Sequence, residues 1–120
     1  MTAFSQPQRE ALIDLLILSI FVDAHLSLAE DHALHSAIDS LGWASEHPRE
    51  IFVLNSFSRG RRASESDDTM AQYVSTRAEV FPEPARRAEA LTQIRTVLES
   101  DGLAEQETSF LRHVTAAFGA

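Results

Sequence analysis

The chain has 120 residues, of which 44% are hydrophobic and 23% charged, and its formal net charge is −8. This composition predicts one soluble globular domain, and the acidic charge disfavours nucleic acid as a partner because phosphates would be repelled. The absence of cysteine excludes disulfides, thiolate metal sites and cysteine nucleophiles, and it fits a cytoplasmic location.

The first predicted helix begins after Ser5, which is placed to cap it, and ends near Asp23. Its residues 11–22 are apolar on nearly every side, which predicts a position at the centre of a helical bundle. The run contains Asp14 and Ser19 and is too short to span a bilayer, so at most peripheral membrane contact is expected. The same apolar surface leaves open whether one bundle encloses the helix or a homodimer covers part of it.

The second predicted helix begins with Ser27 and Glu30, which have the spacing of a capping box, and ends at Gly42. A third helix is predicted from Ser45, carrying apolar residues up to Phe57. Three arginines, Gly60 and several serines and acids follow, so the segment 56–68 is predicted to be a mobile loop between two halves.

Three more helices are predicted after that loop. The fourth begins with Asp67 and Asp68, which suit the positive end of a helix dipole, and proline residues separate it from the fifth. The fifth runs to about Ser100 and the sixth starts at about Ala104, each with apolar residues at helical spacing. No stretch alternates with the period of two typical of strands, so the expected fold is all-α.

One short pattern occurs in both halves of the chain: an aspartate after an apolar helix, a tight turn, then a helix that opens with a glutamate and ends at a glycine. The residues are Asp23, Glu30 and Gly42 in the first copy and Asp101, Glu107 and Gly119 in the second. The second turn is one residue shorter. The repeat predicts a bundle of about six helices built from two pseudo-symmetric three-helix halves, at about 5–58 and 65–120.

The repeated carboxylates suggest a divalent cation as ligand, because hard cations prefer several oxygen donors. The predicted ligands are Asp23, Glu30, Asp101 and Glu107. Asp31 and His35 are four residues apart on one helix face and are weaker candidates for a transition metal. The alternative is structural: Glu30 completes a capping box, and each aspartate caps a turn.

The two turns also carry a family resemblance. Asp23, Leu26, Ser27 and Glu30 match the pattern D-G-x-[IL]-[ST]-x-x-E, with Ala24 in place of the glycine. Asp101, Gly102 and Glu107 match it in the second half, with one residue deleted. In this respect the chain resembles the tellurite resistance TerB-like family. The resemblance implies an all-α domain with pseudo-two-fold symmetry and an acidic face, belonging to bacterial stress and metal-resistance systems, and it implies no enzymatic activity.

Two functional hypotheses follow. The first is a TerB-like stress or metal-resistance domain that binds a divalent cation at its acidic helix junctions. The second is a metal-free module that binds protein partners through its acidic face or an apolar groove. An enzyme is not expected, because the sequence contains no recognisable nucleophile and base, phosphate-binding loop or zinc-peptidase signature.

Overall fold

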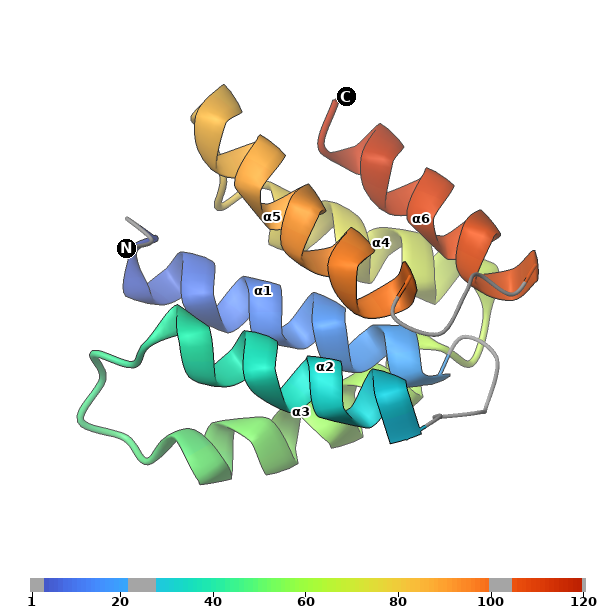
Figure 1. The fold of residues 1–120 in the computed structure, drawn as a ribbon. Coiled ribbons are helices and arrows are strands. Elements are labelled where there is room, and N and C mark those ends of the chain that lie inside the picture. Colours follow the sequence, from blue (N-terminus) through green and yellow to red (C-terminus); the bar gives the residue numbers. More distant parts are fainter. Residues whose placement is uncertain (1–3, 22–27, 100–104, 120) are drawn as a thin grey trace.

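The computed structural model describes residues 4–21, 28–99 and 105–119, without the side chains of 28–31 and 105–107. The described chain is helical and contains no strand, which confirms the predicted all-α class with six α-helices (Figure 1). The elements are α1 (Gln6–Leu18), the 3-10 turn η1 (Ser19–Phe21), α2 (Leu28–Leu41), α3 (Arg49–Ala63), α4 (Asp67–Ala78), α5 (Pro84–Leu98) and α6 (Glu105–Ala117). The relation of the two halves by an internal repeat stays a prediction.

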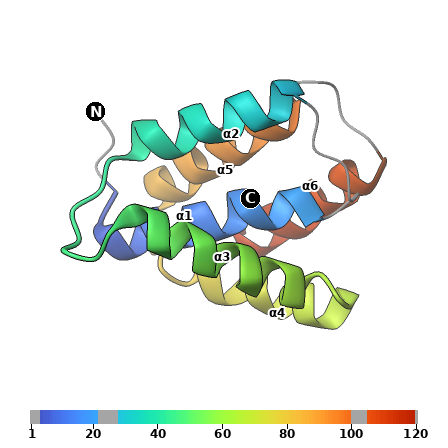
Figure 2. The same cartoon turned by 90° about the horizontal axis from the view of Figure 1, so that it is seen from below.

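Helix α1 lies at the centre of the bundle, as its apolar composition predicts. Every residue from Ala11 to Ser19 is buried, and α1 contacts α2, α3, α4 and α5. Figure 2 shows α2 and α5 on one side of α1 and α3 and α4 on the other. Helix α6 completes the bundle by packing against α4 and α5. Among the helices described, none has both the length and the apolar composition that a membrane crossing requires.

Local capping chemistry sets several helix ends. The Ser5 hydroxyl accepts a hydrogen bond from the Gln8 amide, and the Gln8 side chain accepts one from the Ser5 amide, so the predicted cap of α1 is confirmed. Gly42 and Gly119 follow α2 and α6 with φ of 78° and 73°, a conformation that costs other residues more. Ser27 of the predicted Ser27–Glu30 capping box lies outside the described residues, and the side chain of Glu30 is not described.

The predicted limits of the third helix are wrong at both ends. Helix α3 begins at Arg49, because Pro48 disfavours helical backbone at the residue before it and itself occupies the N-cap position. At its other end α3 continues through most of the predicted loop to Ala63, and α4 begins four residues later with Ser66 as its cap.

The continuation of α3 through Gly60 has a packing cause. This glycine is buried against the end of α1, where an added Cβ would lie 3.3 Å from the Phe21 ring and 3.6 Å from the Leu18 Cα. Gly60 therefore allows α3 to approach the end of α1 closely and does not end α3.

The apolar residues at helical spacing in the last three helices supply much of the remaining core. Met70, Tyr73 and Leu91 are half-buried, and Ala88 of α5 is exposed. The residues of the fourth, fifth and sixth predicted helices that are buried as expected are Val74, Phe81, Ile94, Val97, Leu98, Phe110, Leu111, Val114 and Phe118.

We predict that Gly60→Val lowers the free energy of unfolding by about 2 kcal/mol, because the branched side chain would overlap Phe21 and the backbone of α1. Chemical denaturation measures the change. The matched control is Ala71→Val on the exposed face of α4, which should cost less than about 0.7 kcal/mol. Equal losses in the two variants would contradict the close approach at Gly60.

Candidate functional site

Most of the predicted metal ligands lie outside the described structure. Asp23 and Asp101 belong to segments that it does not describe, and the side chains of Glu30, Asp31 and Glu107 are likewise not described. His35 is described: it is exposed on α2, at the edge of a groove that α2 forms with α3.

No group of three or more potential metal ligands occurs within residues 4–21, 28–99 and 105–119, leaving aside the side chains noted above. This search does not include Asp23, Asp101 or the side chains of the other predicted ligands. The divalent-cation site therefore stays a prediction at those positions.

An apolar groove lies between α2 and α3. Both helices rest on the α1–η1 segment, and the groove between them has a volume of about 390 Å³. Ile20 of η1 lines it together with apolar residues of both helices, namely Leu34 and Ile38 of α2 and Val53, Leu54 and Phe57 of α3. In Figure 1, α2 and α3 lie below α1 on the page.

Charged side chains border this groove. His35 and Asp39 belong to α2, and Arg49 and Glu50 to the start of α3. Arg49 donates a hydrogen bond of 2.9 Å to Asp39 and so connects the two helices across the groove. The Asp39 side chain is 69% exposed, so this ion pair contributes little to stability. The site is an apolar surface with a polar border.

Helix α3 has its polar and apolar sides inverted relative to an ordinary surface helix. Its fully buried residues are small or polar, namely Ser56, Gly60 and Ala63, while Phe52 and Val53 are half-buried against the core. Its large apolar side chains Ile51, Leu54 and Phe57 are 55%, 69% and 37% exposed, and among the described residues they are the exposed large hydrophobic ones. Scattered apolar residues are normal on a protein surface, whereas three on one helix beside an apolar groove form a patch.

The orientation of α3 follows from an ion cluster at Asp14. This carboxylate, on the buried helix α1, is 7% exposed and accepts three hydrogen bonds. The Ser56 hydroxyl lies 2.6 Å and the Arg59 guanidinium 2.8 Å from Oδ1, while Nε of Arg77 on α4 lies 3.1 Å from Oδ2. A buried carboxylate needs such partners, so the cluster fixes α3 and α4 against α1.

Aromatic rings support the two arginines of this cluster. The Arg59 guanidinium lies 4.9 Å from the centre of the Phe52 ring, and the Arg77 guanidinium lies 3.7 Å from that of Tyr73. Burial alone would lower the pKa of Arg59, but the hydrogen bond and negative charge of Asp14 outweigh it and raise that pKa. The three donors already occupy the Asp14 carboxylate, so its role is structural.

The Tyr73 hydroxyl is the least satisfied polar group near this cluster. It is buried and makes no hydrogen bond of normal geometry within the described residues, although the Arg59 guanidinium is near enough to interact with it electrostatically. Burial of the phenol, reinforced by the charge of Asp14, raises the pKa of Tyr73 above its ordinary value of 10.0.

An apolar groove was one of the predicted partner surfaces, but its place between two helices was not predicted, and neither was the cluster. The sequence contains one indication of the cluster, because a carboxylate within an apolar helix, here Asp14, requires a buried partner. Its partners Ser56 and Arg59 fell in the predicted loop or at its edge. The exposure of Leu54 and Phe57 depends on the rotation of α3, which those partners determine.

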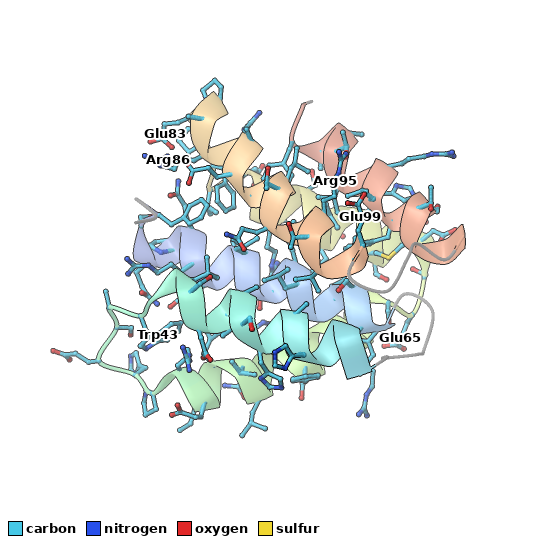
Figure 3. All side chains as sticks on the ribbon, viewed as in Figure 1. Trp43, Glu65, Glu83, Arg86, Arg95 and Glu99 are labelled. Atoms are coloured by element: carbon cyan, nitrogen blue, oxygen red, sulfur yellow. The ribbon has the colours of Figure 1, made fainter. Side chains whose placement is uncertain are left out.

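A second hollow, between α5 and the residues that follow α6, has a more mixed lining. It includes Leu91 and Arg95 of α5 and Glu99 at the end of that helix, and Figure 3 labels the last two. Arg87 also lines it and donates hydrogen bonds to the backbone carbonyls of Phe81 and Phe118, so its guanidinium holds the end of α6. This arrangement is explained by helix packing.

Comparison of the chain with known protein families, with curated proteins and with solved structures found no match. The TerB-like resemblance therefore remains a hypothesis that rests on the two short motifs, and the function is argued from the surfaces.

We predict that Asp14→Asn lowers the free energy of unfolding by about 2 kcal/mol, because two arginines lose their shared counter-charge. The loss is below that of a fully buried pair because the Arg59 and Arg77 side chains are 34% and 22% exposed. Urea denaturation provides the measurement. Asp39→Asn, which removes the exposed ion pair with Arg49, is the control and should cost at most about 0.5 kcal/mol. A loss at Asp14 no larger than this would refute the structural role of the cluster.

A second prediction concerns alkaline pH. Tyr73 is the single tyrosine of the chain, so phenolate absorbance reports its ionisation directly. Its pKa should be above 10 in the folded protein and near 10 in denaturant. Since burial favours the neutral phenol, the corresponding stability is intact below pH 10 and is lost as the pH rises through the folded-state pKa. A native titration midpoint at or below that in denaturant would contradict the burial of the hydroxyl.

Proposed function

We propose that this chain is a non-enzymatic protein-interaction module and that its docking surface is the groove between α2 and α3, together with the exposed side of α3. The observation that carries the proposal is the inverted orientation of α3. Its fully buried residues are small or polar, and three of its large apolar residues, Ile51, Leu54 and Phe57, are exposed beside an apolar groove, whereas Phe52 and Val53 are half-buried against the core.

The energetics favour a partner at this surface. Fully burying one large apolar side chain is worth roughly 1.5–3 kcal/mol, and Ile51, Leu54 and Phe57 forgo much of that in the isolated chain. A partner that covers them recovers this free energy. The charged border of the groove, with Asp39, Arg49 and Glu50, resembles the polar rim that surrounds the apolar centre of protein interfaces.

The polar clusters favour a binding role over an enzymatic one. The Asp14 carboxylate accepts hydrogen bonds from three donors, and the Arg87 guanidinium donates hydrogen bonds to two backbone carbonyls. A catalytic carboxylate or arginine needs a free position directed at substrate, and neither group supplies one.

We predict that a photo-crosslinking amino acid at position 54 forms a specific protein adduct in the cells that naturally produce this protein. Leu54 is 69% exposed on the proposed surface, so the substitution should leave the fold unchanged. The control places the same amino acid at Arg95, which is exposed on α5, on the opposite side of α1 from α3 (Figures 2 and 3).

Mass spectrometry of the adducts identifies what lies against each position. An adduct at position 54 that is absent at position 95 supports the docking surface. The proposal fails if position 54 gives no adduct, or if both positions give the same adducts.

A further inference from the structure

We propose that the partner at this surface is a second copy of the same chain, with the two α3 helices packed antiparallel about a two-fold axis. This inference rests on the proposed function, since it names the occupant of the same docking surface. The sequence pattern of the exposed side of α3 carries it.

Four exposed residues form one stripe along α3. Glu50, Leu54, Phe57 and Arg61 follow one another at intervals of four, three and four residues, which is the spacing of the seam between two packed helices. The stripe is acidic at the start of the helix, apolar at its middle and basic toward its end.

This stripe is complementary to itself when the second copy runs in the opposite direction. A two-fold axis at the middle of the stripe brings Leu54 against Phe57 of the second copy and Glu50 against Arg61 of the second copy. The same two contacts recur on the other side of the axis, as a symmetric dimer requires. A parallel pairing would instead place Glu50 against Glu50 and Arg61 against Arg61, so the charges select the antiparallel arrangement.

The groove extends this contact beyond the single stripe. Leu54 and Phe57 belong to its α3 wall, and Leu34 and Ile38 of α2 and Ile20 of η1 line the remainder. A helix laid along the stripe would therefore cover the neighbouring groove and remove apolar surface of α2 from water as well.

The overall charge of the chain also bears on the choice of surface. Two molecules of net charge −8 repel one another, so self-association requires a region that is not acidic. Helix α3 provides one: Arg49 and Arg59 are paired with Asp39 and Asp14, and the charges left on its exposed side are Glu50, Arg61 and Arg62. The two α3 helices would therefore meet at a part of the surface where the electrostatic repulsion between the two acidic chains is weak.

The test uses the 120-residue chain and measures its mass by sedimentation equilibrium over a range of concentrations. The wild type should form a concentration-dependent species of twice the 13.3 kDa chain mass. Glu50→Arg and Arg61→Glu should each raise the dissociation constant about tenfold, because each converts both symmetry-related attractions into repulsions. The double variant Glu50→Arg/Arg61→Glu restores opposite charges and should return the dissociation constant to within about threefold of wild type.

Arg95→Glu on α5 is the control for a change of net charge and should leave the dissociation constant unchanged. Helical circular dichroism of each variant verifies folding, and the recovery of the double variant separates a lost contact from a lost fold. The inference is overturned if the wild type stays monomeric, or if the double variant is as weak as the single variants.

Failure of this inference is distinguishable from failure of the proposed function. A monomeric wild type whose position-54 adduct contains another protein overturns the homodimer and supports the docking surface. A monomeric wild type that gives no adduct overturns both.

Discussion

The arrangement of this molecule depends on one buried charge. Asp14 lies on the most deeply enclosed helix, where an unpaired carboxylate would be far too costly, so the helices around it must supply donors. Helix α3 supplies Ser56 and Arg59, and α4 supplies Arg77. The first two lie three residues apart, within one helical turn, and together they determine which side of α3 faces the core.

That rotation has a consequence for the surface. Since α3 is attached through Ser56, Arg59 and Gly60, Phe52 and Val53 are half-buried against the core, whereas Ile51 and Leu54 lie on the other side of the helix. Leu54 lies two residues before Ser56 and is consequently directed away from the core, at 69% exposure. A helix packed by its apolar stripe would have buried Leu54 and exposed Arg59. The ion cluster therefore holds α3 in an orientation that apolar burial alone would not select, which is a role in specificity that buried polar groups serve in some proteins.

Much of the fold was predictable from local signals. The uniform apolarity of residues 11–22 placed α1 at the centre, and capping chemistry located Ser5 and Gly42, because these effects act within a few residues. The extent of α3 was not predictable in this way. Glycine commonly marks the end of a helix. Gly60 instead lies within α3, and its role depends on Phe21, a residue distant along the chain. The groove was not predictable for a related reason: periodicity identifies an apolar stripe, but the tertiary contacts decide whether another helix covers it.

Helix α3 has the contacts that stabilise the fold on one side and the proposed docking surface on the other. Changes at the Asp14 cluster act on the folded state itself, whereas changes at Leu54 alter a side chain that contributes little burial to the isolated chain. The two sides are nevertheless coupled through mass action, because any partner that binds the folded chain and not the unfolded one adds to its stability. A partner at the proposed surface would act on helix α3. Directional bonds to Asp14 hold its inner side, and its apolar side acquires burial when a partner covers the groove. Burial of the exposed apolar side chains of α3 would thus contribute to the free energy of binding. In the proposed complex, the polar groups of α3 keep their hydrogen bonds and its apolar side chains are covered.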